Sequence, residues 1–243
     1  MLLGKYLKSA ALRRIFFFER WDTMGIFDII GPVMVGPSSS HTAGAARIGQ
    51  TARAILGEPV KEARITLYGS FAKTGKGHGT DRALAAGLMG YAPDSGTIRD
   101  ALNIAKQRGI DISFYLSEED MGHPNVAKID ANGIHGAHVS VVGRSLGGGR
   151  IMVTSIDGYD VEITGEEYTL LTRHNDKPGV VAKVCEELAK EQINISTMRL
   201  FRKGKGSEAV MIIHTDQPVP PDVAEKVKNS NENITYVMAL DII

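Results

Sequence analysis

Residues 168–190 read YTLLTRHNDKPGVVAKVCEELAK, in which a short β-forming run meets a polar loop and then an apolar stripe at helical spacing. The β-forming run predicts a strand over 168–174, and the stripe predicts a helix over 178–190 that begins at Pro178. Farther along, the same patterns predict a strand at 194–203, a strand at 207–215, a helix at 219–228 and a strand at 233–242. The order βαββαβ within about 75 residues predicts a ferredoxin-like domain over 168–243.

The loop between the first strand and the first helix of this domain is suited to a small ligand. A helix start offers free N–H groups to a carboxylate, and Gly179 lets a ligand approach the backbone closely. Asn175 and Asp176 stand where they can bind a ligand ammonium group. The alternative is that Asn175 and Asp176 only cap the helix. Asn175, Asp176, Pro178 and Gly179 are therefore a candidate ligand site.

The segment 168–243 resembles the ACT domain family. The resemblance rests most on RHNDKPGVVAKV at 173–184, which is followed by a second strand, INISTMRL, at 193–200. It implies a regulatory module with an amino-acid effector, or a module that dimerises by pairing its sheets or helices. The single cysteine, Cys185, lies at an apolar position of the predicted helix and is expected in the core.

A second informative stretch is GPSSSHTAGAARIG at 36–49, where an extended segment enters a helix predicted over 42–56. Ser38, Ser39, Ser40 and Thr42 supply hydroxyls, and the helix start supplies N–H donors, so the stretch predicts a cradle for a small anion. His41 adds a side chain that titrates near neutral pH. The alternative is a capped helix with a surface histidine. A serine hydrolase is disfavoured because the chain has no G-x-S-x-G elbow.

Two further clusters contain histidine. YGSFAKTGKGHGTD at 68–81 contributes His78, Thr80 and Asp81; it does not match the P-loop pattern, and its glycines favour a flexible loop before a helix at 80–90. MGHPNVAKI at 121–129 contributes His123 and Asn125 at the start of a strand. A zinc site built from His78, His123, His135 and His138 is an alternative, although the spacing fits no standard pattern.

The first part of the chain is predicted to be an α+β domain over 24–160. A strand is expected at 60–71, a helix at 97–109 capped by Thr97, and strands at 111–117, 125–131, 136–145 and 150–158. The polar stretch 159–167 is interpreted as the boundary to the second domain. Residues 1–23 are interpreted as a weakly ordered extension before a second start at Met24; the alternative is a helical targeting or docking segment.

Composition excludes several classes of function. Lys and Arg total 28, Asp and Glu total 28, and the net charge is zero, so a nucleic-acid surface is not expected. The apolar cluster near the N-terminus is too short to span a membrane. With 1 cysteine in 243 residues, the chain can form neither an internal disulfide nor a cysteine-rich metal site of its own. A cytoplasmic location is the simplest expectation.

The clusters together resemble a known family. GPSSSHTAGAARIG, YGSFAKTGKGHGTDRALAAGLMG, GHPN and SLGGGRI, followed by an ACT domain, resemble the beta chains of bacterial iron–sulfur L-serine dehydratases over 24–243. The resemblance implies that L-serine loses water and then ammonia to give pyruvate. It also implies a 4Fe–4S cluster held by cysteines of a separate alpha chain, whose open iron acts on the serine hydroxyl. This chain is then expected to be inactive alone.

The resemblance also suggests roles for individual residues. Ser38, Ser39, Ser40 and Thr42 become the cradle for the substrate carboxylate, and His41 becomes the base or an orienting donor. His78, Thr80, Asp81, His123 and Asn125 are weaker candidates for the same interface. The glycines at 147–149 either allow close backbone approach or form a plain hairpin.

A rival interpretation comes from a second resemblance. The first domain is also similar to the allosteric substrate-binding domain of some phosphoglycerate dehydrogenases, which implies a regulatory anion site and no catalyst in this chain. A third interpretation is an assembly subunit whose ACT domain serves only to dimerise. Fold alone does not decide among these functions.

Overall fold

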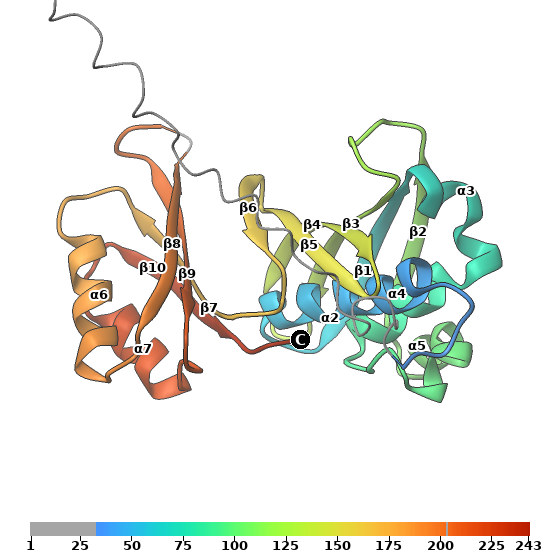
Figure 1. Ribbon diagram of the computed structural model, residues 1–243, viewed down its shortest axis with the longest axis horizontal. Helices are drawn as coiled ribbons and strands as arrows, with labels where there is room; N and C mark the ends of the chain where they lie inside the picture. The colour runs from blue at the N-terminus through green and yellow to red at the C-terminus, as the bar shows by residue number, and fades with distance from the viewer. Residues whose placement is uncertain (1–32, 203) are drawn as a thin grey trace, which may run out of the picture. The chain divides into compact units, whose positions relative to one another are not determined.

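The computed structural model describes residues 33–202 and 204–243, which form two β-sheets with their helices (Figure 1). The first sheet has the strand order β2-β1-β3-β4-β5-β6, and the second has the order β10-β7-β9-β8. The expectations for residues 1–23 and for the segment 25–31 lie outside the described residues. The α+β class is confirmed.

The first sheet is mixed. Its strands are β1 (Val60–Tyr68), β2 (Asp111–Ser117), β3 (Asn125–Gly133), β4 (His138–Gly147), β5 (Arg150–Ile156) and β6 (Tyr159–Ile163). β1 and β2 pair in parallel, whereas the other neighbours pair antiparallel. A parallel pair needs a long crossover, and the helices between β1 and β2 supply it.

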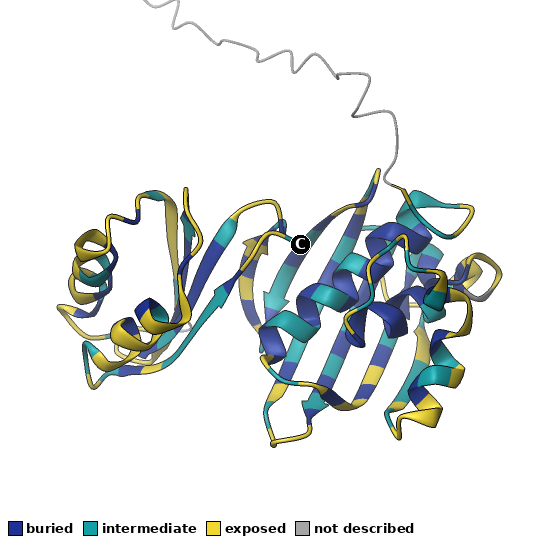
Figure 2. Cartoon of the chain, turned by 90° about the horizontal axis from the view of Figure 1, so that it is seen from below, coloured by how far each residue is buried: buried dark blue, intermediate teal, exposed yellow. Residues whose placement is uncertain are grey.

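The helices of this part lie across one face of the sheet, with their buried residues toward it (Figure 2). They are η1 (Ser39–Gly44), a π-helical turn, and then α2 (Ala45–Leu56), α3 (Gly69–His78), α4 (Thr80–Leu88), the 3₁₀ turn η2 (Gly96–Asp100) and α5 (Ala101–Gln107). α2 and α4 approach closely: a Cβ built on Gly87 would lie 2.0 Å from the carbonyl oxygen of Ala46. Small residues at this crossing let the backbones touch and fix the position of η1 at the start of α2.

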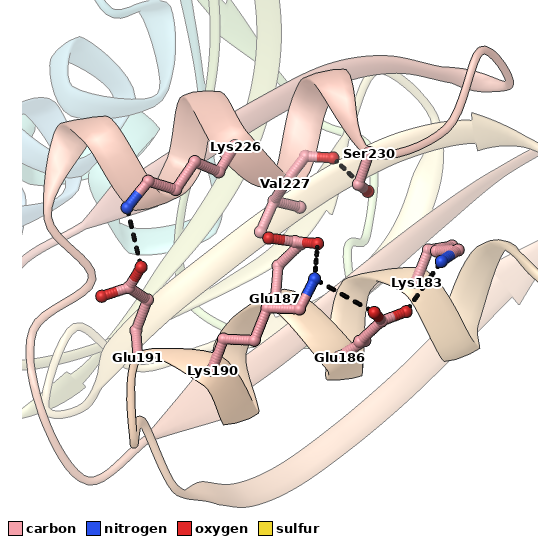
Figure 3. Close-up of polar contacts among 8 residues, drawn as sticks. All are labelled: Lys183, Glu186, Glu187, Lys190, Glu191, Lys226, Val227 and Ser230. Carbon is pink, nitrogen blue, oxygen red and sulfur yellow. Dashed lines mark hydrogen bonds and ion pairs between the residues drawn. The ribbon is translucent and has the colours of Figure 1, made fainter.

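The second sheet confirms the predicted βαββαβ order. Its elements are β7 (Tyr168–Asn175), α6 (Val180–Lys190), β8 (Ile195–Arg202), β9 (Glu208–Thr215), α7 (Pro221–Asn229) and β10 (Ile234–Leu240). Both helices pack on one face, where Leu170, Val184, Leu188 and Val227 are buried. Exposed ion pairs link the two helices on their outer surfaces, for example Lys226 of α7 with Glu191 at the end of α6, which are 2.7 Å apart (Figure 3). Such pairs contribute little compared with the apolar contacts beneath them.

Two segments differ from their predicted structures. The glycine-rich stretch expected as a flexible loop forms α3, over Gly69–His78. Its glycines lower helix propensity, but packing of Phe71, which is fully buried, outweighs that cost. The stretch 159–167, interpreted as a turn-rich boundary, begins with β6, which pairs with β5. Tyr159, Val161 and Ile163 alternate as buried residues between polar ones, the pattern of a strand with one buried face.

Helix starts are the other point of difference. The helix predicted to begin at Pro178 begins at Val180, and Gly179 is its N-cap with φ 91°. A residue with a side chain adopts that left-handed backbone only at a cost, so the glycine defines the turn. Thr97 is not the cap predicted for the helix at 97–109; the Ser95 side chain accepts a hydrogen bond from the Thr97 N–H instead. The helix predicted from 42 is preceded by η1, which begins at Ser39.

Candidate functional site

The serine-rich segment forms a buried turn at the entrance to α2. Ser38 caps η1: its Oγ accepts a hydrogen bond from the His41 N–H at 3.3 Å, and its carbonyl accepts one from the Thr42 N–H at 2.9 Å. The fully buried Ala43, Ala45 and Ala46 hold the turn against the rest of the domain. The imidazole of His41 is thereby held inside the protein, with 8% of the residue exposed. The alternative of a surface histidine is wrong.

Hydroxyl groups surround both nitrogens of His41. Ser38 Oγ lies 3.3 Å from Nδ1, while Ser70 Oγ lies 3.2 Å and Thr74 Oγ1 lies 3.1 Å from Nε2. The edge of the ring contacts Phe71, with centroids 5.2 Å apart. Because a hydroxyl can donate or accept, this shell stabilises either neutral tautomer of the ring.

Ser70 and Thr74 were not among the predicted site residues. Both lie on α3, one helical turn apart, and so present their hydroxyls on one face of that helix. The i, i+4 spacing of two hydroxyl residues is the signal in the sequence. Interpreting the segment as a loop concealed it.

His78, at the end of α3, lies beside His41, with ring centroids 4.9 Å apart. Burial and, next, the charge of His78 lower the pKa of His41, while its hydrogen bond with Ser70 acts in the opposite direction. The net effect keeps His41 neutral at pH 7, in the form that can accept a proton. The cluster is therefore suited to general base chemistry.

This electrostatic arrangement makes a testable prediction. In the full chain, NMR titration of the His41 ring protons should give a pKa below the usual histidine value. Replacement of His78 by asparagine removes a neighbouring positive charge, so the pKa of His41 should rise while remaining below that of an exposed histidine. A His41 pKa unchanged or lowered in His78→Asn would contradict the assigned cause. His138→Asn, on an exposed residue whose ring bonds to Asn132, is the matched control.

The GHPN segment meets the start of α3. The carbonyl of Pro124 accepts hydrogen bonds from the N–H groups of Ser70 and Phe71, and Asn125 bridges to Gly69. His123 Nδ1 accepts from the Asn125 N–H at 3.2 Å, and burial, more than the charge of Arg144, lowers the pKa of His123. The side-chain oxygen of Asn125 is buried without a partner among the described residues. His123 and Asn125 are thus brought next to the helix that carries Ser70 and Thr74.

The remaining residues predicted in this domain have different surroundings. Ser39 and Ser40 are half-buried, and a Cβ built on Gly147 would lie 3.8 Å from Ser40 Oγ, so the glycine hairpin adjoins η1. Thr42 and Thr80 are buried, and the hydroxyl of each has no partner among the described residues. Asp81 accepts a hydrogen bond from the N–H of Arg82.

The structure contradicts the zinc alternative. His123 precedes the nine-residue strand β3, whereas His135 and His138 lie beyond its other end. At about 3.3 Å per residue these groups are about 30 Å apart along the strand. Within the described residues, no group of three or more His, Cys, Asp or Glu side chains is arranged to hold a metal ion.

The candidate ligand loop of the second domain is exposed. Asp176 accepts hydrogen bonds from Arg202 at 2.7 Å and from the Gly206 N–H at 3.2 Å, and the bond from Arg202 is the main cause of its lowered pKa. Asn175 ends β7, and neither Asn175 nor Asp176 makes a side-chain cap bond to α6. The capping alternative is therefore wrong. Pro178 and Gly179 form the exposed turn before α6.

Comparison with known proteins gives two family matches: Serine dehydratase beta chain over residues 25–110 and ACT domain over residues 168–231. A Bacillus subtilis (strain 168) protein named "Probable L-serine dehydratase, beta chain" is 43% identical over 202 residues, covering 83% of this chain and 91% of that protein. The "L-serine dehydratase, beta chain" of Peptoniphilus asaccharolyticus is 37% identical over 194 residues, covering 79% of this chain and 87% of that protein.

A second group of relatives is longer than this chain. The "D-3-phosphoglycerate dehydrogenase" of Methanocaldococcus jannaschii is 32% identical over 186 residues, which cover 76% of this chain and 34% of that protein. Within the part of the chain that the structure describes, no helix has the length and apolar character needed to cross a membrane.

Proposed function

This chain belongs to the L-serine dehydratase beta-chain family, and we propose that it completes the active site of an L-serine ammonia-lyase whose cluster-binding alpha chain is a separate polypeptide. In this reaction L-serine loses water to give 2-aminoacrylate, and the imine tautomer of that product takes up water and releases ammonia to leave pyruvate. The observation that carries the proposal is His41, held neutral and buried with hydroxyls on both nitrogens. We place the complex in the cytoplasm.

The donor set of this chain does not fit a 4Fe–4S cluster. Such clusters are held by several cysteine thiolates, and this chain has one cysteine, Cys185. Cys185 is half-buried on α6, where burial raises the pKa of its thiol and so disfavours the thiolate. The cluster that the family resemblance implies is therefore assigned to the alpha chain.

The role proposed for His41 is to remove the proton from the α-carbon of serine. If Nδ1–H donates to Ser38 Oγ, the Nε2 lone pair faces α3 and is free to accept a proton. Ser70 and Thr74, within 3.2 Å and 3.1 Å of Nε2, then hold the ring in place until substrate displaces one of them. The lowered pKa keeps the base unprotonated at neutral pH.

The serine-rich turn and the GHPN segment are proposed to bind the rest of the substrate. Ser39 and Ser40 are half-buried, with the Ser40 hydroxyl beside the glycine hairpin, whereas the N–H groups of His41 and Thr42 are already used within the turn. The cradle for the carboxylate thus rests on side chains more than on the helix N–H groups. His123 and Asn125 are proposed to line the same interface, since they adjoin the start of α3.

The chain is proposed to have a first domain at 24–160 and a second domain at 168–243. The second domain is assigned a regulatory role. An ACT domain suggests an amino-acid effector, with the exposed loop at Asn175, Asp176, Pro178 and Gly179 as its site. Pairing of two ACT domains in a dimer is part of the same proposal. A second candidate function for the whole chain is a regulatory anion-binding subunit, favoured by its 32% identity to one third of a phosphoglycerate dehydrogenase.

The proposal is tested by anaerobic serine-to-pyruvate turnover. We expect no activity from this chain alone, activity when it is mixed with a cysteine-bearing alpha chain from the same genome, and loss of that activity in air. A mixture that assembles with an intact cluster yet makes no pyruvate would reject the dehydratase function and favour the regulatory one.

A further inference from the structure

A small cavity of about 160 Å³ lies beside His78, at the end of α3. Its wall includes Gly36, Thr42, His78, Arg82, Ile98 and Arg99. No Asp or Glu belongs to that wall within the described residues. The cavity is thus lined by two guanidinium groups and an imidazole, with no carboxylate among them.

Both arginines lack a partner in the described part of the chain. Neither the Arg82 nor the Arg99 guanidinium forms an ion pair or hydrogen bond there, although other arginines, such as Arg202, bind carboxylates. The nearest acid in sequence, Asp81, directs its carboxylate to the backbone N–H of Arg82. A guanidinium carries five N–H donors in a planar fork that matches a carboxylate, so this wall presents unused donors to an anion.

A buried hydroxyl on the same wall supports a ligand independently. Thr42 is 1% exposed, and its Oγ1 has no hydrogen-bond partner among the described residues. A Cβ built on Gly36 would lie 2.2 Å from that oxygen, so only glycine leaves the hydroxyl uncrowded at this point of the wall. A buried hydroxyl without a partner is costly, and a ligand oxygen in the cavity would satisfy it.

We propose that this cavity is a carboxylate-binding site in which Arg82 and Arg99 bind the carboxylate oxygens and Thr42 donates a further hydrogen bond. Because His78 both lines the cavity and contacts the ring of His41, a carboxylate bound here is coupled to the proposed base. The carboxylate is either that of a separate small effector or that of the serine substrate, and in the second case Arg82 and Arg99 bind it in place of Ser39 and Ser40. The inference that the ligand is the serine substrate rests on the proposed function. The inference that the cavity binds a carboxylate does not.

The first arm of the test measures binding by the full chain without an alpha chain. Acetate and L-serine are titrated while the arginine Nε–Hε resonances are followed by NMR, with L-serinol, which lacks the carboxylate, as the negative ligand. We expect acetate and serine, but not serinol, to shift the Arg82 and Arg99 signals. Arg82→Gln and Arg99→Gln should each weaken binding at least tenfold, whereas Arg108→Gln, which removes an arginine bonded to Tyr91, should not.

The second arm measures serine kinetics in the complex with the alpha chain. If the carboxylate belongs to the substrate, Arg82→Gln raises the KM for serine at least tenfold; if it belongs to an effector, KM is unchanged and the response to acetate is lost. Arg82→Lys, which keeps the charge without the fork, should give an intermediate effect, and it carries the test if Arg82→Gln does not fold.

The outcomes separate this inference from the proposed function. The site is rejected if acetate shifts neither arginine signal and if the Arg82→Gln and Arg99→Gln chains bind serine as tightly as wild type. That conclusion holds even if the complex makes pyruvate. Arginine-dependent binding in a complex that makes no pyruvate would retain the site and reject the dehydratase function.

Discussion

Replacement of His41 by alanine is expected to lower the kcat for serine in the complex with an alpha chain by about 10²–10⁴-fold, the usual contribution of a positioned general base. The imidazole is the titratable group at the centre of the hydroxyl shell, and neither Ser70 nor Thr74 can replace it as a base near pH 7. The measurement is anaerobic pyruvate formation at saturating serine, with the cluster content of each sample determined by its visible absorbance.

The pH dependence gives this prediction a second signature. A base must be unprotonated, so kcat/KM should rise with pH through the pKa of His41 and stay level above it. Because burial and His78 hold that pKa below the usual histidine value, activity should persist to a lower pH than an exposed histidine would allow. His78→Asn should move the acidic limb toward higher pH, since it removes a positive charge beside the ring.

The matched control for His41→Ala is His138→Ala. His138 is exposed at the other end of β3 and bonds to Asn132, so its loss should leave kcat unchanged. A His41→Ala complex that keeps normal kcat but changes the cooperativity of serine binding would contradict the catalytic role. It would support the regulatory anion site suggested by the phosphoglycerate dehydrogenase relatives.

The predicted ferredoxin-like domain is confirmed because its short β-forming runs and its helical apolar spacing agree with the final structure. β7 and β9 are short runs of mostly buried residues, and the apolar stripe of α6 gives the buried Val180, Val184 and Leu188. The start of α6 was less predictable, since Pro178 and Gly179 are both typical of a helix start. Tertiary turn geometry, with Gly179 at φ 91°, decided between them.

The composition of the candidate site was only partly predictable. Ser38 and His41 are three residues apart, so the sequence SSSHT is enough to predict that they lie close together. Ser70 and Thr74 reach His41 from α3, whose glycines favour a loop by local propensity. That helix forms because Phe71 is buried and because Pro124 accepts bonds from the first N–H groups, both of which are contacts from distant parts of the chain. No local pattern contains that information.

The close crossing of α2 and α4 leads to the largest predicted effect on stability. In Gly87→Ala the new Cβ would lie 2.0 Å from the Ala46 carbonyl oxygen and 2.8 Å from the Gln50 N, which are backbone atoms that cannot rotate away. The two helices must therefore separate. We expect a loss of about 3 kcal/mol in the free energy of unfolding, at the upper end for overpacking. The measurement is urea unfolding followed by circular dichroism.

Gly77→Ala is the matched control, because it adds the same methyl group to a helix without a clash. Gly77 lies in α3, and a Cβ built on it meets no other atom within 4 Å. Alanine is the better helix former, so this variant should be more stable by about 0.5–1 kcal/mol. α2 begins where η1 ends, so the helix separation in Gly87→Ala should also displace His41 and raise its pKa toward the usual value as burial decreases. A Gly87→Ala chain that unfolds within about 1 kcal/mol of wild type, with the His41 titration unchanged, would show that the α2–α4 contact does not position the site.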